Sequence, residues 1–122
     1  MKACISKFDG DKEYYFEEGC FITELSNSPD DPEVSIARAR VEPGKTTRWH
    51  RLRDTVERYV IVQGSGLVDV GELAAEQVGV GDTVIIPCGC KQRISNTGLN
   101  DLVFLAICSP PFRAAIYEDV DN

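Results

Sequence analysis

A lone histidine and a nearby glutamate carry the chemistry that this sequence offers. His50 is the only histidine in the chain, and Glu57 follows it after six intervening residues. This spacing is typical of metal ligands on adjacent strands, yet the residue two positions after His50 is Leu52, and a leucine side chain binds no metal. The stretch therefore indicates either a metal site that lacks a ligand or a pocket with different chemistry.

Strand alternation predicts which of these side chains share a face. Arg48 and His50 fall on one face of the stretch 46–52, while Glu57 and Tyr59 fall on one face of the stretch 57–64. A short turn between the two stretches would pair them as a hairpin and bring His50 near Glu57. Alternation leaves open which face points into the interior.

Short stretches of β-forming residues, separated by Gly, Pro, Asn and Asp, run along the whole chain. We expect nine strands, at residues 19–25, 34–42, 46–52, 57–64, 66–70, 76–80, 82–87, 91–96 and 101–109. The tail after the two prolines is expected to hold one short helical turn. This pattern predicts an all-β sandwich or barrel. The length favours a single domain, with an N-terminal strand and arm region (1–33), a barrel core (34–109) and a C-terminal tail (110–122).

Composition excludes several classes of protein. The net charge of -7 argues against nucleic acid as a partner, and no apolar run approaches the roughly 20 residues that cross a bilayer. The N-terminus lacks the apolar segment of a secretory signal, so we expect the cytoplasm. The five cysteines are then expected to be reduced thiols, with Cys20 and Cys108 packed in the core.

Charge is distributed unevenly along the chain. Residues 1–33 hold nine acids against three lysines, whereas residues 38–58 hold seven bases against three acids. One interpretation is a pair of solvated charged surfaces. The other is an acidic N-terminal segment that lies across a basic barrel or across a partner subunit.

Two stretches resemble the sequence motifs of the cupin superfamily. Gly44, His50, Glu57 and Gly64 match the spacing of the first motif, G-x5-H-x-H-x3,4-E-x6-G. The second motif, G-x5-P-x-G-x2-H-x3-N, is matched by a set of residues that has glutamine in place of histidine: Gly81, Pro87, Gly89, Gln92 and Asn96. The resemblance covers residues 44–96 and is typical of small single-domain bacterial cupins. It implies a double-stranded β-helix (cupin or jelly-roll) barrel, often dimeric, with a pocket between two sheets.

The departures from the motifs bear on the metal. The resemblance implies three histidines and a glutamate as ligands, and at those positions this chain has His50, Leu52, Glu57 and Gln92. His50, Glu57 and Gln92 are thus the candidate metal ligands. One nitrogen and two oxygens favour a weakly held divalent ion such as Mn, Mg or Ca over tightly bound zinc. The predicted cofactor is one such ion or none.

The same residues also suit a site without metal. A buried carboxylate needs a partner, so without a metal we expect Arg48 to pair with Glu57 or to bind an anionic group of a ligand. Tyr59 and Gln92 add hydrogen-bonding groups to this candidate ligand-binding set. A third interpretation is that Arg48, Glu57 and Gln92 only satisfy one another.

These observations lead to three hypotheses about function. The first is a small isomerase- or lyase-type enzyme that binds an anionic metabolite, with His50 as general acid or base and Glu57 orienting it or acting as base. The second is a non-catalytic small-molecule-binding protein, and the third is a structural dimer with a decayed site. An Arg-lined pocket at His50 would favour the first, whereas an interior filled by Leu52, Tyr59 and Ile94 would favour the third. The expected partners are a small molecule and a second copy of the chain, with neither nucleic acid nor membrane.

Overall fold

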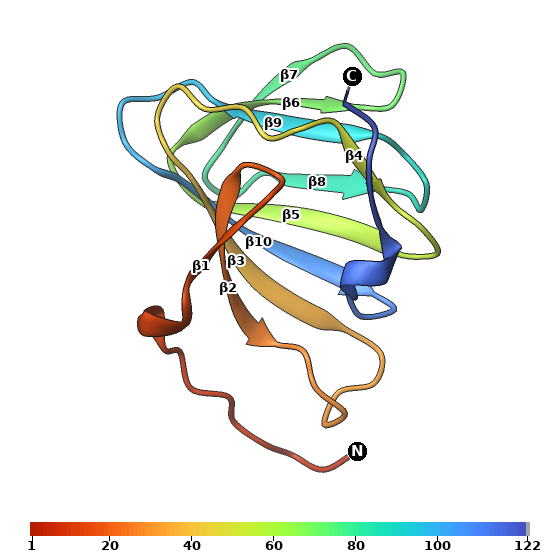
Figure 1. Cartoon of the computed structure of the whole chain (residues 1–122). Helices are drawn as coiled ribbons and strands as arrows, with labels where there is room; N and C mark the ends of the chain where they lie inside the picture. The colour runs from red at the N-terminus through yellow and green to blue at the C-terminus, as the bar shows by residue number, and fades with distance from the viewer. Residues whose placement is uncertain (122) are drawn as a thin grey trace.

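Two antiparallel β-sheets face each other in the computed structural model and enclose the apolar core (Figure 1). The structure describes residues 1–121. One sheet has six strands in the order β1-β2-β3-β10-β5-β8, and the other has five in the order β11-β4-β9-β6-β7. The predicted all-β barrel is confirmed. Within the described residues, no helix is long and apolar enough to cross a membrane.

The strands in chain order are β1 (Tyr14–Phe16), β2 (Cys20–Ser26), β3 (Ser35–Val41), β4 (His50–Leu52), β5 (Val56–Gln63), β6 (Ser65–Val70), β7 (Glu76–Gly79), β8 (Thr83–Ile86), β9 (Gln92–Asn96), β10 (Leu102–Ser109) and β11 (Tyr117–Asp119). Two short 3-10 helices, η1 (Gly10–Lys12) and η2 (Ala114–Ile116), precede β1 and β11. All nine expected strands are present, eight of them within one residue at each end, and η2 is the helical turn expected in the tail. The short strands β1 and β11 were not expected.

The largest difference concerns the predicted strand 46–52, because β4 begins four residues later than expected. The backbone N–H of Arg48 donates to the carbonyl of Glu18 (2.8 Å), and the N–H of Trp49 donates to the carboxylate of Asp121 (3.2 Å). Successive N–H groups therefore bond to separate segments, and no regular ladder forms. Period-two alternation does not extend through this segment.

The core lies between the inner faces of the two sheets. Tyr59 and Ile61 of β5 and Phe104 of β10 are almost fully buried, as the alternation of β5 predicts for its inward face. A second apolar cluster contains Leu52, Cys108 and Ile116, where the C-terminal tail packs against β4 and β10. The inner faces of both sheets thus contribute to the core, and a small cavity remains beside the six-stranded sheet.

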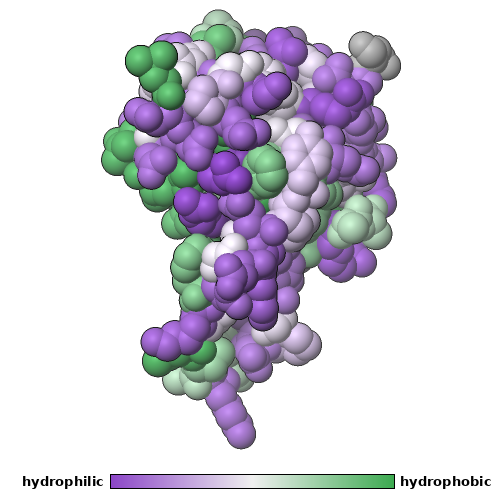
Figure 2. Space-filling model, turned by 60° about the vertical axis from the view of Figure 1, so that its left-hand side comes forward, coloured by the Kyte–Doolittle hydropathy of each residue, from purple (hydrophilic) through white to green (hydrophobic). Residues whose placement is uncertain are grey.

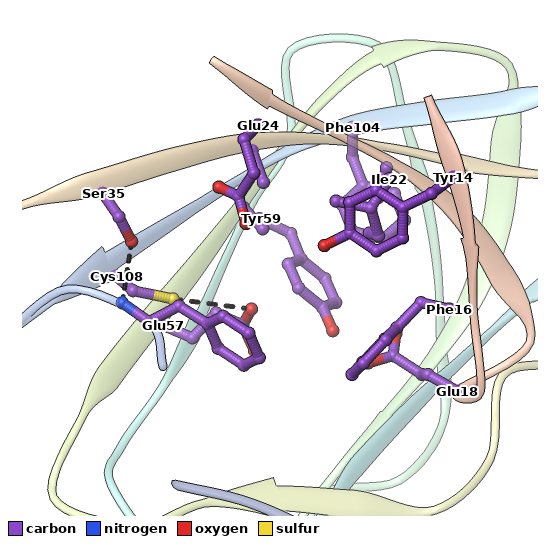
Figure 3. Close-up of a pocket in the computed structure, with 14 residues that line it drawn as sticks. Tyr14, Phe16, Glu18, Ile22, Glu24, Ser35, Glu57, Tyr59, Phe104 and Cys108 are labelled. Atoms are coloured by element: carbon purple, nitrogen blue, oxygen red, sulfur yellow. Dashed lines mark hydrogen bonds between the residues drawn. The ribbon is translucent and has the colours of Figure 1, made fainter. Parts of the chain in front are cut away.

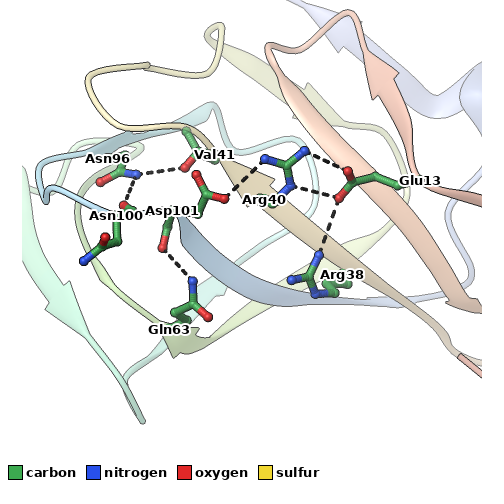
Figure 4. Close-up of polar contacts among 8 residues, drawn as sticks. All are labelled: Glu13, Arg38, Arg40, Val41, Gln63, Asn96, Asn100 and Asp101. Carbon is green, nitrogen blue, oxygen red and sulfur yellow. Dashed lines mark hydrogen bonds and ion pairs between the residues drawn. The ribbon is translucent and has the colours of Figure 1, made fainter. Parts of the chain in front are cut away.

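The last residue of the second motif has a clear structural role. The side-chain amide of Asn96 donates to the carbonyl oxygens of Val41 and Asn100, both at 2.8 Å (Figure 4). These bonds connect the end of β9 with the end of β3 and with the turn before β10. Asparagine at this position therefore stabilises the turn that leads from one sheet to the other.

The N-terminal region combines two strands with an extended arm. Residues 1–9 lead away from the two sheets and are exposed (Figure 1). Glu13, which follows η1, binds Arg40 through two hydrogen bonds of 2.7 and 3.0 Å and also contacts Arg38 at 3.5 Å (Figure 4). The bond to Arg40 lowers the pKa of Glu13. This contact agrees with an acidic N-terminal segment that lies on a basic part of the barrel.

The surface is mainly polar in the view of Figure 2. Hydrophobic residues gather along one edge of that view and near its lower end. The arm and the β2–β3 loop lie at this lower end in Figure 1. The exposed apolar residues of the arm include Ile5 and Phe8, which are 86% and 63% exposed.

Candidate functional site

Three residues of the predicted site form one hydrogen-bonded chain in the barrel interior. Glu57 and Tyr59 project inward from β5, and Gln92 lies opposite on β9. The Tyr59 hydroxyl donates to Gln92 Oε1 (2.5 Å), and Gln92 Nε2 donates to Glu57 Oε1 (2.8 Å). All three side chains are buried. The chain fixes the Gln92 amide, because its oxygen receives the phenol and its nitrogen faces the carboxylate.

Burial dominates the acidity of Glu57. The pKa of Glu57 is raised to about 7, mainly because the carboxyl is removed from water and also because the Glu18 carboxylate is near, while His50, Gln92 and Cys108 act in the opposite direction. Glu57 Oε2 has only the weakly donating thiol of Cys108, at 3.7 Å, as a partner. Glu57 therefore exchanges its proton near neutral pH.

His50 lies beside this chain and faces a residue that the sequence did not suggest. It is paired with Gln92 across β4 and β9, and its Nδ1 lies 2.7 Å from the carbonyl oxygen of Arg48. Because a carbonyl only accepts, Nδ1 carries a proton. Nε2 lies 3.2 Å from Glu18 Oε1. The His50 ring also stacks on Tyr117, with centroids 5.3 Å apart.

The expected pairing of Arg48 with Glu57 is not found. The Arg48 side chain is 48% exposed, and its Nε donates to Asp119 at 2.5 Å. The physical reason is the irregular backbone before β4, which turns Arg48 away from the face that carries His50. Arg48 therefore leaves the predicted ligand-binding set, whereas Tyr59 and Gln92 lie in the barrel interior as expected.

A cavity of about 50 Å³ lies against the inner face of the six-stranded sheet (Figure 3). Its wall contains three carboxylates, from Glu18, Glu24 and Glu57. The remaining lining residues are aromatic, small or apolar: Tyr14, Phe16, Tyr59, Phe104, Phe112, Ser35, Ala37, Ala39, Ala106, Ile22 and Cys108. The small residues of β3 and β10 leave the space that larger side chains would fill. His50 and Gln92 do not line the cavity, and no lysine or arginine does.

Two arrangements were expected to distinguish the hypotheses, an arginine-lined pocket and an interior filled by apolar side chains, and neither is found in full. The pocket is not lined by arginine, and Leu52, Tyr59 and Ile94 are indeed buried. These side chains leave an open space beside Glu57 nonetheless, because Leu52 packs with the C-terminal tail instead of entering the cavity. The interior is therefore only partly filled, and a small cavity remains.

The candidate metal ligands fit a metal ion poorly. His50, Glu57 and Gln92 lie close together, but the Gln92 amide directs its N–H groups, not its oxygen, toward Glu57. Across residues 1–121, no three side chains from His, Cys, Asp and Glu are placed to hold an ion. The place of a second imidazole is taken by Leu52, which is buried among apolar side chains. This donor set lacks the convergent lone pairs that a firmly bound metal needs.

The two core cysteines have a role that the sequence did not indicate. Cys20 and Cys108 are buried as expected, and each thiol contacts a carboxylate: Cys20 with Glu18 at 3.5 Å, Cys108 with Glu57 at 3.7 Å. Desolvation raises the pKa of both thiols, so they remain neutral donors.

Comparison with known proteins identifies the family. The cupin domain family matches residues 37–108, which is more than half of the chain. The chain belongs to the cupin family. This cupin is 32% identical over 114 residues to an uncharacterized protein of Methanocaldococcus jannaschii, a match that covers 92% of this chain and 90% of that protein.

Two further similarities connect this cupin to characterised proteins. It is 33% identical over 96 residues to auxin-binding protein 1 of Arabidopsis thaliana, covering 71% of this chain but 48%, about half, of that protein. Among solved structures, Pac13, a nucleoside dehydratase, superposes with a TM-score of 0.76 at 17% identity, covering 94% of this chain and 90% of that one. The latter likeness shows the shared fold.

Glu18 and Glu24 are the carboxylates of the cavity wall that the sequence analysis missed. Glu24 lies in β2, two residues after Ile22, and Glu18 lies two residues before Cys20, where β2 begins; both line the cavity. The signal was present, because alternation along residues 18–24 places these side chains on one face of this cupin. It was not used because the family motifs begin only at Gly44.

Proposed function

We propose that the cavity of this cupin binds a small polar metabolite and that Glu57 transfers a proton in an isomerase- or lyase-type reaction. The observation that carries the proposal is the buried carboxyl of Glu57, which lines the cavity and has its pKa raised to about 7. A general acid or base is most effective when its pKa lies near the working pH. Glu57 meets this condition, and cupin-type binding of small molecules suits its position in the barrel.

The neighbours of Glu57 suit a proton-transfer role. Gln92 and Tyr59 hold Oε1 in a fixed direction, which leaves Oε2 for a ligand. Of the predicted roles, this proposal keeps Glu57 as the base and changes that of His50, which becomes a positioning residue whose Nε2 contacts Glu18. Pac13, which shares this fold, is a nucleoside dehydratase, and dehydration is a lyase-type reaction.

The structure changes the charge that we expect the ligand to carry. The anionic ligand depended on Arg48, which lies on the surface, and the cavity wall carries three carboxylates instead. We therefore propose a ligand that donates hydrogen bonds to Glu57, not one that brings a negative charge to it.

A thermal-shift screen of small metabolites tests the proposal. A ligand of the cavity stabilises the parent protein, because binding to the folded state alone raises the melting temperature. The stabilisation should vanish in Ala106→Leu, which fills the cavity without changing charge, and should persist in Arg48→Ala. Equal stabilisation of the parent and Ala106→Leu by every hit would contradict the proposal.

Catalysis is distinguished from binding by proton exchange. A ligand found in the screen is incubated with the protein in D2O, and its C–H signals are followed by proton NMR. We expect exchange of a C–H adjacent to a carbonyl or hydroxyl group with the parent and none with Glu57→Gln. Binding without exchange in the parent would favour the alternative of a non-catalytic binding protein, whereas the absence of any cavity ligand in the screen would favour a structural dimer with a decayed site.

A weakly held divalent ion at His50, Glu57 and Gln92 is the second candidate, and metal analysis separates it from the first. Since the Gln92 amide faces Glu57 with its N–H groups, we expect sub-stoichiometric metal in both the untagged parent and Glu57→Ala. Stoichiometric metal in the parent and none in the variant would instead support the ion.

We also propose a cytoplasmic homodimer. Free thiols at all five cysteines suit a reducing compartment. The exposed apolar residues of the arm suit a second copy of the chain.

A further inference from the structure

The cavity wall combines two kinds of group that rarely meet around an anion. Carboxylates of Glu18, Glu24 and Glu57 share the wall with five aromatic rings, from Tyr14, Phe16, Tyr59, Phe104 and Phe112 (Figure 3). Aromatic faces and carboxylates both attract positive charge. Their combination is the chemistry of a site for an organic cation.

Glu57 and Glu18 each have one carboxylate oxygen that accepts only a weak hydrogen bond. Glu57 Oε1 receives Gln92 Nε2, but Glu57 Oε2 has only the Cys108 thiol at 3.7 Å. Glu18 Oε1 faces His50 Nε2, but Glu18 Oε2 has only the Cys20 thiol at 3.5 Å. Glu57 and Glu18 are 8% and 9% exposed, so water satisfies them little. Thiols are weak donors, and a stronger donor in the cavity would complete both groups.

No basic side chain compensates these carboxylates from the cavity wall. The arginines of the neighbouring strands point outward, where each has its own partner: Arg40 binds Glu13, Arg58 binds Ser109, and Arg93 binds Asp69. An anionic ligand would therefore meet carboxylates and no basic side chain in the wall, since His50, which contacts Glu18 Oε1, is not among the lining residues. A cationic ligand would supply the charge that the wall lacks.

The aromatic part of the wall limits the shape of the ligand. The Tyr59 and Phe104 rings lie 4.3 Å apart at the inner end, and the Phe16 and Phe112 rings meet edge to face at 6.2 Å. Between them, the small side chains of Ala37 and Ala106 leave room for a short alkyl group. The volume of about 50 Å³ admits a few non-hydrogen atoms only.

From these contacts we propose that the cavity selects a small organic ammonium ion, a protonated amine on a short alkyl chain. Its N–H groups donate to Glu57 and Glu18, and its alkyl part packs against the aromatic rings. The inference rests on the proposed function, in that the cavity is taken as the ligand site, and it adds the chemical class of the ligand.

Three probes of equal size test the charge preference. The full chain is titrated with n-propylammonium, 1-propanol and propionate at matched ionic strength and constant pH, and binding is followed by NMR shifts of the Tyr59 ring and the Ala106 methyl group. We expect saturable shifts with n-propylammonium, and affinities at least about tenfold weaker for the alcohol and the carboxylate.

Variants then assign the charge preference to the cavity. Glu57→Gln and Glu18→Gln should each weaken n-propylammonium by about tenfold or more, since each removes a charge-assisted hydrogen bond but keeps the side-chain shape. The control is Glu42→Gln, which removes the same charge at an exposed position and should leave the affinity unchanged. Circular dichroism and the melting temperature check that each variant is folded.

The outcomes separate this inference from the proposed function. Saturable binding of 1-propanol or propionate at the same residues, equal to or tighter than that of n-propylammonium, would overturn the cation preference while supporting the cavity as a ligand site. An equal loss in Glu42→Gln would also overturn it, because the effect would then come from net charge. If none of the three probes shifts the Tyr59 or Ala106 signals, both the cation preference and the cavity as a binding site are contradicted.

Discussion

At the scale of single residues, Glu57 differs from a typical glutamate because its buried surroundings raise its pKa and favour the protonated carboxyl. The groups that face it are Glu18, His50, Tyr59, Gln92 and Cys108, and only His50 can bring a positive charge. Desolvation therefore outweighs the partners, and its pKa lies at about 7. The buried carboxylate that the sequence expected to be neutralised by Arg48 or a metal is instead kept protonated over much of the acidic range.

This shift predicts how stability changes with pH. The folded chain holds the Glu57 proton more tightly than the unfolded chain, where the pKa is 4.5, so the stabilising contribution is complete below about pH 4.5 and is lost as the pH rises through about 7. The total change corresponds to about 3 kcal/mol in the free energy of unfolding. Glu57→Gln does not titrate at this position.

Urea denaturation of both proteins measures the effect. The stability of the parent relative to Glu57→Gln should fall between about pH 5 and about pH 8. A difference that stays constant across this range would show that Glu57 titrates normally in the folded protein.

The residues of the site were only partly predictable from sequence. Glu57, Tyr59 and Gln92 follow from the motif spacing and from alternation in regular strands. Arg48 was misplaced because its segment has no regular ladder, which depends on contacts with distant parts of the chain. Glu18 was missed because the family motifs begin only at Gly44, although alternation along residues 18–24 places it on the same face as Glu24. Its contact with His50 could not be predicted, since that contact joins segments far apart in the sequence.

At the scale of elements, the strands were predictable because most alternate between buried and exposed side chains, and turn formers separate them. The two strands that were missed have three residues each, too few for a period of two to be recognised. Their formation depends on pairing with β2 and β4, so tertiary contacts and not local sequence determine them.

The turn after β5 offers a test of why glycine ends the first motif. Gly64 and Gly44 have similar positive φ values, 81° and 78°, but a Cβ at position 64 would lie 2.8 Å from the carbonyl oxygen of Asp101, whereas one at position 44 would meet nothing within 4 Å. Gly44→Ala should cost about 1 kcal/mol for the left-handed backbone. Gly64→Ala should cost about 1–2 kcal/mol more, because the neighbouring backbone must move.

Chemical denaturation of the two variants provides the comparison. Equal losses of stability would mean that the backbone angle alone, and not the close approach of the β9–β10 turn, requires glycine at position 64.

At the scale of the whole molecule, the N-terminal arm exposes apolar side chains that the fold of a single chain leaves unburied. Its apolar residues Ile5 and Phe8 are exposed, while Glu13 fastens the end of the arm to Arg40. We expect the arm to pack on a second copy, so that the full chain is a dimer in solution. Deleting residues 2–9 should reduce the mass measured by light scattering to that of a monomer.

A matched control uses an exposed hydrophobic residue outside the arm. Leu99, in the β9–β10 turn, is 94% exposed, and Leu99→Ser should leave the dimer intact. A monomeric full chain, or a dimer that persists without the arm, would contradict this assignment.

The proposed function requires that the cavity of this cupin holds a carboxyl group that exchanges its proton near neutrality. The most direct measurement is a carbon-13 NMR titration of the Glu57 side-chain carboxyl in the full chain, with Glu57→Gln used to assign the signal. We expect a midpoint of about pH 7 that falls when n-propylammonium is added, because a bound cation favours the carboxylate. A midpoint near the ordinary value of 4.5 would contradict it.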